Sequence, residues 1–331
     1  MIDDMDNQAA KLRELARKAE KERRAEERAA QGGTTIPLPA NPTTPSGRVS
    51  QRKVPYTMAV TSGKGGVGKT LVSVNLAIKF AEAGLKVLII DADLGLANID
   101  VVLGLNPEHT MEDVLDGHKT LDEVVVTGPK GVTILPAASG VAELSDLSEE
   151  KRASLLDHID SWNADFDVVI VDTGAGISPN VRYFILSVEK ILVVATPDPA
   201  SITDAYALMK VMYMNHRITN FELVVNQANS RKEALQVYKA ISDVAEKFLN
   251  IGLHYSGFIP RDEVLQRAVR EQKPVTIGYP ECEASQAFDT LVDSMIQGWQ
   301  QNRDNAGRAT FFWRRVLEDE ENSSTSEPES S

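Results

Sequence analysis

Apolar residues follow a regular rhythm over most of the chain. From residue 56 onward, short runs rich in valine, isoleucine and leucine alternate with segments of helix length. Several of these runs are continuously apolar, as is typical of strands that are covered on both faces of a parallel sheet. The pattern predicts a doubly wound, mostly parallel α/β sheet with helices on both faces. The predicted strands are 58–61, 87–90, 132–135, 168–171, 191–195, 223–225 and 257–259, and a closing helix is predicted over 284–299.

The first 55 residues have a different pattern. Residues 1–30 predict one helix, because opposite charges recur at i,i+4 and only a narrow apolar face is present. Residues 31–55 contain a Gly32-Gly33 pair and four prolines between positions 37 and 45, which predict a flexible linker. The folded α/β domain is therefore expected to span 56–300.

The C-terminal residues predict two further segments. Residues 301–317 are expected to contain an amphipathic helix in which bulky apolar side chains stand beside arginines. Two interpretations of it stay open: an anchor at a membrane surface, or docking in a groove of its own domain. Residues 318–331 carry six acids and no base, and predict an acidic disordered tail. The candidate membrane residues are Phe311, Phe312, Trp313, Arg314, Arg315, Val316 and Leu317.

Composition excludes several classes of protein. A single cysteine, Cys282, allows no disulfide framework and no thiolate-clustered metal site within one chain, which favours a reducing, cytoplasmic compartment. The net charge is −13, and the two tails are neutral in sum, so residues 56–300 hold the whole excess. Because a domain with this negative charge repels the phosphate backbone, it should bind DNA poorly, and no nucleic-acid partner is expected. No run approaches the roughly 18 apolar residues of a membrane span, and the charged N-terminus is no signal peptide.

A glycine-rich loop follows the first predicted strand and leads into a helical pattern, which is the setting that a Walker A phosphate loop requires. Backbone N–H groups of such a loop close around phosphates, and the helix N-terminus favours their charge. Lys69 should neutralise the β- and γ-phosphates, and the Thr70 hydroxyl should hold Mg²⁺. The expected nucleotide-binding residues are Gly63, Lys64, Gly65, Gly66, Val67, Gly68, Lys69, Thr70 and Leu71.

Three carboxylates follow other buried strands. Asp91 and Asp93 end the second strand, and Asp172 ends the strand 168–171. Phosphoryl transfer depends mainly on positioning and on stabilised charge, so carboxylates near a metal at this edge suit it. An acid at the end of a strand can also serve only as a helix cap.

The sequence Lys-Gly-Gly-Val-Gly-Lys-Thr, with Lys64 ahead of the usual lysine, resembles the deviant Walker A ATPases of the MinD, ParA and nitrogenase-reductase class. The resemblance implies that ATP is held between two subunits and that Lys64 reaches the nucleotide of the partner. It implies catalytic roles for Lys64, Lys69 and Asp93, the last orienting the attacking water. It also implies that Thr70, Asp93 and Asp172 hold Mg²⁺, and that Asp91 supports the loop around Asp93.

Two further points come from the same resemblance. Gly174 stands where the class usually has alanine or proline, which could loosen the loop after Asp172. Asn226, Pro260 and Asp262 match the positions that form the adenine pocket, with Asn226 as the main contact. A guanine-specifying Asn-Lys-x-Asp sequence is absent, so ATP is expected rather than GTP.

Within this class, residues 93–105, 135–140 and 201–208 are similar to the FlhG/FleN regulators of flagellar number. Residues 7–13 resemble the motif by which those proteins stimulate the SRP-type GTPase FlhF, although Asn7 replaces the usual aspartate. Gln8, Leu12 and Arg13 would make the partner contacts. The resemblance implies an ATP-dependent homodimer that binds the inner face of the cell membrane in its ATP state. Flagellar switch (C-ring) proteins and a flagellar transcription regulator are further candidate partners.

Other branches of the class remain alternatives. A MinD-like cell-division ATPase and a ParA-like positioning ATPase share the same nucleotide motifs. An adaptor that binds ATP but hardly hydrolyses it would also carry them. An iron–sulfur carrier is excluded, because a single cysteine cannot supply the two bridging thiolates that each subunit needs.

Overall fold

The computed structural model describes residues 55–93, 98–137, 148–162 and 164–303. All of them belong to a unit that spans Arg52–Ser331. The predicted N-terminal helix and acidic tail lie outside the described residues. The predicted linker also lies outside them apart from Pro55, as does the predicted C-terminal helix apart from residues 301–303, which belong to the helix that begins at Glu283. So do Gln8, Leu12 and Arg13, the candidate membrane residues 311–317, and residues 94–97 between Asp93 and Asn98.

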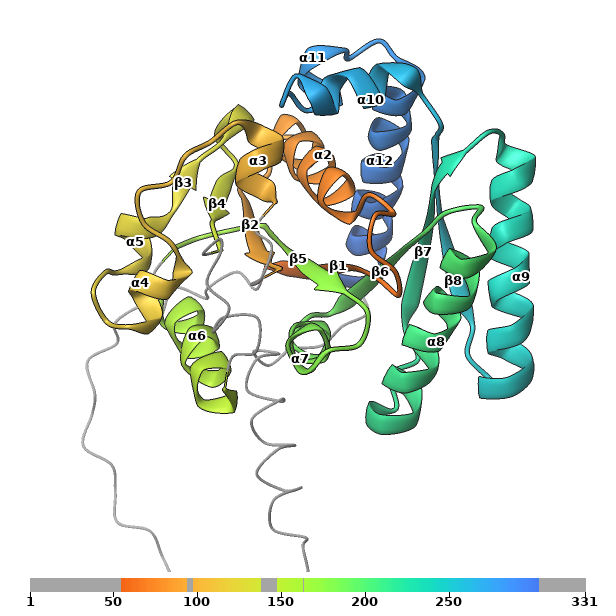
Figure 1. Cartoon of the computed structure of the whole chain (residues 1–331), viewed down its shortest axis with the longest axis horizontal. Coiled ribbons are helices and arrows are strands. Elements are labelled where there is room, and N and C mark those ends of the chain that lie inside the picture. Colours follow the sequence, from red (N-terminus) through yellow and green to blue (C-terminus); the bar gives the residue numbers. More distant parts are fainter. Residues whose placement is uncertain (1–54, 94–97, 138–147, 163, 304–331) are drawn as a thin grey trace, which may run out of the picture. The chain divides into compact units, whose positions relative to one another are not determined.

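One eight-stranded sheet forms the centre of this unit, with the strand order β3-β4-β2-β5-β1-β6-β7-β8 (Figure 1). Every neighbouring pair is parallel except the edge pair β3–β4. The predicted doubly wound, mostly parallel sheet is confirmed, and each of the seven predicted strands is present. The strands are β1 (Tyr56–Ser62), β2 (Val87–Ala92), β3 (Val126–Thr127), β4 (Thr133–Leu135), β5 (Val168–Ala175), β6 (Lys190–Ala195), β7 (Phe221–Ala228) and β8 (Leu253–Pro260).

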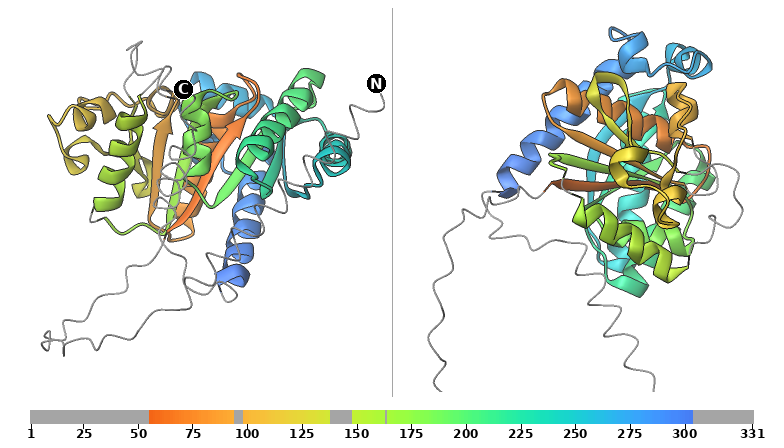
Figure 2. Two further views of the ribbon diagram at one scale, coloured as in Figure 1. Left: turned by 90° about the horizontal axis from the view of Figure 1, so that it is seen from below. Right: turned by 90° about the vertical axis from the view of Figure 1, so that its left-hand side faces the viewer.

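Helices cover both faces of the sheet (Figures 1 and 2). The apolar residues of α2, α3, α10, α11 and α12 pack on one face, and those of α4 to α9 pack on the other. The helices are α2 (Lys69–Glu82), α3 (Ile99–Leu103), α4 (Met111–Leu115), α5 (Leu121–Val124), the 3₁₀ turn η1 (Pro129–Gly131), α6 (Glu149–Ser161), α7 (Pro179–Leu186), α8 (Pro199–His216), α9 (Arg231–Leu249), α10 (Glu263–Arg270), α11 (Val275–Gly278) and α12 (Glu283–Arg303).

Alternation along the strands divides the core into two apolar layers. In β1, Met58 and Val60 face α2 and α12, whereas Ala59 faces the opposite layer, and all three are fully buried. Burial of one large aliphatic side chain contributes about 1.5–3 kcal/mol, so the continuously apolar strands account for a large share of the folding free energy. Among the described residues, no helix is both long and apolar enough to cross a membrane.

Four of the longer helices begin at a side chain that accepts a backbone N–H. Ser148, Ser178, Asp198 and Ser230 cap α6, α7, α8 and α9 in this way. Each such cap contributes about 1 kcal/mol and fixes the residue at which the helix starts. The start of α8 matters for the site, because its cap, Asp198, lies at the carboxyl edge of the sheet.

The strand order brings three loops together. Strand β1 lies between β5 and β6, and β5 lies between β1 and β2. The register places Asp172 of β5 beside Asp91 on one side and beside Val60 on the other. The loops that follow β1, β2 and β5 therefore meet at one edge of the sheet, where ligands bind in open α/β folds.

Candidate active site

The phosphate loop connects β1 to α2, and its glycines satisfy two separate requirements. Gly66 and Gly68 have φ angles of +78° and +91°, a region that favours glycine. Gly63 has no room for a side chain, because a Cβ there would lie 2.0 Å from the backbone oxygen of Asp204 in α8. The loop thus packs directly on α8, and α2 begins at Lys69 with its first N–H groups directed at the loop. This arrangement can bind an anion.

Lys69 is buried at the start of α2, near the carboxylates of Asp172 and Asp93. Burial lowers the pKa of its ammonium group, and the charges of Asp172 and Asp93 partly oppose that effect. A buried cation at the mouth of an anion-binding loop is poised to neutralise phosphate oxygens. The residues around it take the expected places: Lys64, Gly65 and Gly66 in the loop, Val67 buried beneath it, and Thr70 and Leu71 in the first turn of α2.

Asp172 provides a test of whether the site fits Mg²⁺. Its Oδ1 accepts a hydrogen bond of 2.8 Å from the Ser73 hydroxyl, and the Thr70 hydroxyl also bonds to this carboxylate. Its Oδ2 is buried and has no hydrogen-bond partner among the described residues. Burial raises the pKa of Asp172 to about 6, although Ser73, Thr70 and Lys69 lower it. An unpartnered carboxylate oxygen beside a hydroxyl is a donor set that Mg²⁺ prefers, so the residues fit this metal.

Asp91 fixes the described backbone on both sides of residues 94–97. One carboxylate oxygen accepts the N–H of Asp93 at 3.2 Å, and the other accepts the N–H groups of Asn98 and Ile99 at 3.0 and 3.1 Å. Burial and the neighbouring Asp172 raise the pKa of Asp91 to about 8, against the effect of the three N–H groups. Asp91 thus fixes the backbone that presents Asp93.

Asp93 is half-buried and lies beside Gly174. A Cβ at position 174 would come within 3.2 Å of Asp93 Oδ1 and 3.5 Å of Val181 Cγ2. Glycine therefore leaves room for the Asp93 carboxylate at a position where an alanine would press on it. Burial raises the pKa of Asp93, and Lys69 lowers it. A carboxylate that lies near Lys69 and Asp172 can orient a water molecule or a metal ligand.

The residues predicted to bind the base fall into two groups. Asn226 is buried against the phosphate loop: its Nδ2 donates to the Val67 oxygen at 2.8 Å, and its Oδ1 accepts the N–H of Gln227 at 2.9 Å. A Cβ on Gly68 would lie 2.5 Å from Asn226 Nδ2. The amide thus ties the phosphate loop to β7 through its Nδ2, an anchoring role that the sequence had not indicated, while its Oδ1 bonds within β7.

Pro260 and Asp262 lie beyond β7, at the end of β8. Asp262 Oδ1 caps α10 by accepting the N–H of Val264 at 2.7 Å, and its Oδ2 accepts the N–H of Ala284 at 3.3 Å. The structure therefore brings Asn226 onto the phosphate loop, and it ties Asp262 to α10 and α12. Neither hydrogen bond of Asp262 reaches Asn226 or the loop.

Lys64 forms an ion pair with Asp198 that the sequence did not predict. Its Nζ lies 2.6 Å from Asp198 Oδ2, and both side chains are more than 40% exposed. Hydrogen bonding to Asp198 raises the pKa of Lys64, and the same contact lowers the pKa of Asp198. The other oxygen of Asp198 caps α8 through the N–H of Ala200. The only available signal was an Asp-Pro pair after a buried strand, a common helix start.

Comparison with known proteins agrees with this geometry. Residues 58–275 match the CobQ/CobB/MinD/ParA nucleotide binding domain. The chain is 41% identical over 261 residues to the antiactivator FleN of Pseudomonas aeruginosa, covering 79% of this chain and 93% of that protein. It is 34% identical to the flagellum site-determining protein YlxH of Helicobacter pylori, over 72% of this chain and 81% of that protein.

Solved structures give the same result for the fold. The cell division ATPase MinD of Pyrococcus furiosus superposes with a TM-score of 0.61 at 26% identity, covering 74% of this chain and 99% of that one. MinD of Pyrococcus horikoshii, solved with Mg-ADP, has a TM-score of 0.60 at 25% identity, over 73% and 96% of the two chains. The chain belongs to the MinD/ParA family of P-loop ATPases, in the group that contains FleN and YlxH, and it is an ATP hydrolase.

Proposed function

We propose that this protein is an ATP-driven switch that controls the number or placement of flagella. It would bind Mg-ATP between two copies of the chain, hydrolyse it, and change partners as the dimer forms and separates. The observation that carries the proposal is the position of Lys64. This lysine is exposed on the phosphate loop, and its ammonium group forms an ion pair with Asp198 of its own chain. The extensive identity to FleN supports the flagellar role.

Different residues of this chain would have separate roles in ATP hydrolysis. Lys69 and the loop N–H groups would hold the phosphates, and Thr70 and Asp172 would hold Mg²⁺, which supplies charge neutralisation at the transferring phosphoryl group. Asp93 would orient the attacking water, on a backbone fixed by Asp91. Phosphoryl transfer needs little covalent chemistry from the protein, so these positioning roles suffice.

Lys64 would give the site its dependence on a second copy. In the proposed dimer the ammonium group of Lys64 leaves Asp198 and binds the nucleotide of the partner. The ATP phosphates and the Asp198 carboxylate therefore compete for this ammonium group. Solvent and salt screen an ion pair between exposed side chains, so phosphate binding can overcome it. The contact would therefore hold the lysine without preventing dimerisation.

The N-terminal and C-terminal segments would contact the partner GTPase and the membrane. Gln8, Leu12 and Arg13 would stimulate an FlhF-type GTPase, and the helix with Phe311, Phe312 and Trp313 would bring the ATP-bound dimer to the inner face of the cell membrane. One such helix binds lipid weakly, and a dimer presents two, which strengthens binding by avidity. Because these residues lie outside the described part of the chain, this assignment depends on the sequence alone.

A role in cell division is the second candidate, since septum site-determining MinD proteins are also relatives. The MinD of Helicobacter pylori is 28% identical over 72% of this chain, well below the 41% found for FleN. A comparison with ParA-type structures at 22% identity supports only the fold. The flagellar role is therefore the better supported of the two.

Complementation tests the proposed role directly. A Pseudomonas aeruginosa strain that lacks FleN should regain its normal number of flagella when it produces this chain, and should not regain it with the Lys69→Ala variant. Failure of the wild-type chain, produced at the level of FleN, would contradict the flagellar role but not the ATPase activity.

The dimer is tested by sedimentation. Lys64→Ala should bind ATP and remain monomeric, whereas Asp93→Ala should lose turnover and accumulate as dimer. Asp198→Asn keeps a capping oxygen for α8 but removes the ion pair, so it should dimerise at lower ATP concentration than the wild type. Normal ATP-dependent dimerisation of Lys64→Ala would contradict the role of this lysine between subunits.

A further inference from the structure

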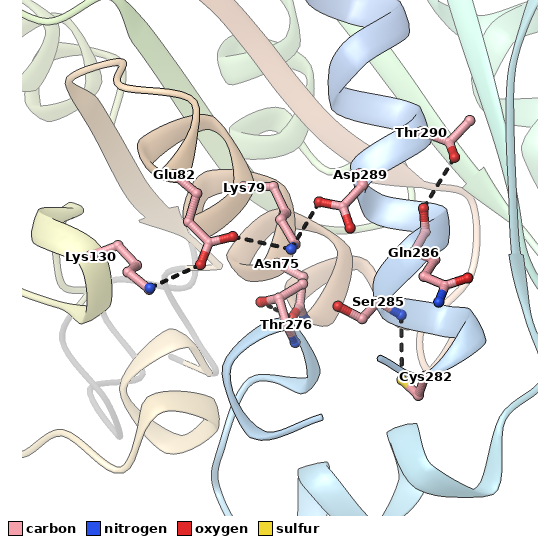
Figure 3. A network of polar contacts seen from close by, with 10 residues as sticks. All are labelled: Asn75, Lys79, Glu82, Lys130, Thr276, Cys282, Ser285, Gln286, Asp289 and Thr290. Atoms are coloured by element: carbon pink, nitrogen blue, oxygen red, sulfur yellow. Dashed lines mark hydrogen bonds and ion pairs between the residues drawn. The ribbon is translucent and has the colours of Figure 1, made fainter. Parts of the chain in front are cut away.

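A buried hydrogen-bonded pair joins the phosphate helix to a distant part of the chain. Asn75 in α2 is fully buried, and Thr276 in α11 is 2% exposed. Asn75 Oδ1 accepts the Thr276 N–H at 3.2 Å and the Thr276 hydroxyl at 2.9 Å. Figure 3 shows the two side chains meeting between α2 and the segment that precedes α12.

Asn75 also connects this contact to the first turn of α2. Its Nδ2 donates to the backbone oxygen of Leu71 at 2.8 Å, and Leu71 directly follows Lys69 and Thr70. Every polar atom of the amide is thus engaged on a defined partner. Because a buried polar group without a partner costs about 1–3 kcal/mol, this geometry leaves α11 little freedom to shift relative to the phosphate end of α2.

Thr276 lies in the middle of residues 260–284, here called the base-side segment. This segment connects β8 to α12 and includes Pro260 and Asp262, the residues proposed to border the base. Its first part is fixed to the sheet, since the Arg261 N–H donates to the Ala228 oxygen at 2.9 Å. Asp262 also joins the two ends of the segment, through the N–H of Ala284. The Asn75–Thr276 pair fixes the middle of the segment to the phosphate helix.

From this arrangement we infer that Asn75 and Thr276 are positioning residues that set the selectivity of the site for the adenine base. They fix the base-side segment in one position relative to the phosphate loop, so the edge groups of a bound base meet the same backbone and side-chain groups each time. ADP and GDP have equal reach from phosphate to base, and the fixed segment separates them by the edge groups in which adenine and guanine differ. The inference rests on the ATP binding of the proposed function and on the base pocket predicted from the sequence, and it is independent of dimerisation and of any flagellar role.

A second contact on the same helix offers a matched control. Lys79 lies four residues beyond Asn75 and bonds to Asp289 of α12 at 2.8 Å and to Glu82 at 3.1 Å. Figure 3 places this ion-pair group beside the Asn75–Thr276 pair, but on α12 instead of α11. Both contacts hold α2 against the C-terminal part of the chain, and only the Asn75–Thr276 pair reaches the base-side segment.

The experiment measures the affinities of the full-length chain for ADP, GDP and pyrophosphate by calorimetry. Thr276→Val removes one donor at nearly constant volume, Thr276→Ser retains that donor, and Lys79→Met removes the control contact. Loss of one buried hydrogen bond should weaken ADP binding by about three- to tenfold. Pyrophosphate affinity should stay unchanged. GDP affinity should fall less than ADP affinity, so the preference for ADP over GDP should fall. Thr276→Ser and Lys79→Met should keep the preference of the wild type.

Other outcomes would overturn the inference. Equal losses for ADP, GDP and pyrophosphate in Thr276→Val would mean that the pair only supports α2. Unchanged ADP affinity, with a normal melting temperature, would mean that the segment needs no such contact. Equal affinity of the wild type for ADP and GDP would overturn the base pocket together with this inference, and would leave the proposed dimer untouched.

Discussion

The phosphate side and the base side of the site are built in different ways. On the phosphate side, eight consecutive residues from Gly63 to Thr70 form the loop and start the helix. The carboxylates of Asp91 and Asp172, in the C-terminal halves of β2 and β5, and of Asp93, just after β2, complete it. On the base side, residues 75, 226 and 260–284 are assembled by contacts that span up to 201 positions. Chemistry that depends on backbone N–H groups can be encoded locally, whereas the shape of a pocket depends on how distant segments pack.

The largest effect is expected when the phosphate side loses the positive charge of Lys69. Lys69→Ala should reduce affinity for Mg-ATP by about 100-fold or more, because a charge-assisted contact in a buried site contributes roughly 3 kcal/mol. The loss should be equally large for pyrophosphate, which lacks a base. Calorimetry with both ligands checks this, and circular dichroism checks the fold. A pyrophosphate affinity close to that of the wild type would show that Lys69 does not act on the phosphates.

An intermediate effect is expected for Asn226, which belongs to both sides. Its amide donates to Val67 in the phosphate loop, so Asn226→Ala should weaken pyrophosphate as well as ADP, each by about five- to tenfold. Gln227→Asn is the matched control, because asparagine tolerates the φ of +58° at that position. If only ligands that carry a base lose affinity, Asn226 acts as a base contact and not as a loop anchor.

The smallest effect is expected away from both sides, at the contact between α2 and α12. Lys79→Met should lower the free energy of unfolding by about 1 kcal/mol and leave the affinity for ADP unchanged. Although burial acts in the opposite direction, Asp289 and Glu82 raise the pKa of Lys79, and Lys130 and Lys79 lower that of Glu82.

The pH dependence of this contact follows from those directions. The depressed pKa of Glu82 contributes stability above its ordinary value, and this is lost as the pH falls through the folded value. The raised pKa of Lys79 contributes stability that is lost only as the pH rises through its own folded value. Chemical denaturation should therefore show the difference between wild type and Lys79→Met at neutral pH and a smaller one below about pH 4. A difference that stays constant down to pH 3 would contradict an ionic contact.

The difference between the two sides also explains what sequence could predict. The phosphate loop, Asp91, Asp93 and Asp172 could be placed because each directly follows an apolar strand, and the sheet brings strand ends together. Ser73 could not be singled out, because its partner Asp172 lies 99 positions away. Asp198 could not be paired with Lys64, 134 positions earlier, for the same reason. Strand β3 was missed because two residues give no periodic signal.

The base-side residues show a further limit. Asp262 was selected by resemblance, and its two oxygens in the structure are used by α10 and α12. A carboxylate that follows Pro260 gives the same pattern in sequence whether it borders a ligand or caps a helix. Its contact with the base stays a prediction, and Asn75 and Thr276 gave no signal that would separate them from ordinary core residues.

The central place of β1 has a consequence for how the chain folds. This strand is the first of the sheet to leave the ribosome, yet its two neighbours, β5 and β6, begin only at residues 168 and 190. The middle of the sheet therefore closes through pairings of high sequence separation, which fold slowly because loop closure precedes the gain in contacts. Until about residue 195 is available, the strand that carries the phosphate loop lacks one of its flanking strands. Nascent chains should thus acquire nucleotide affinity late in synthesis, and a chain that stops short of β6 should be prone to aggregation.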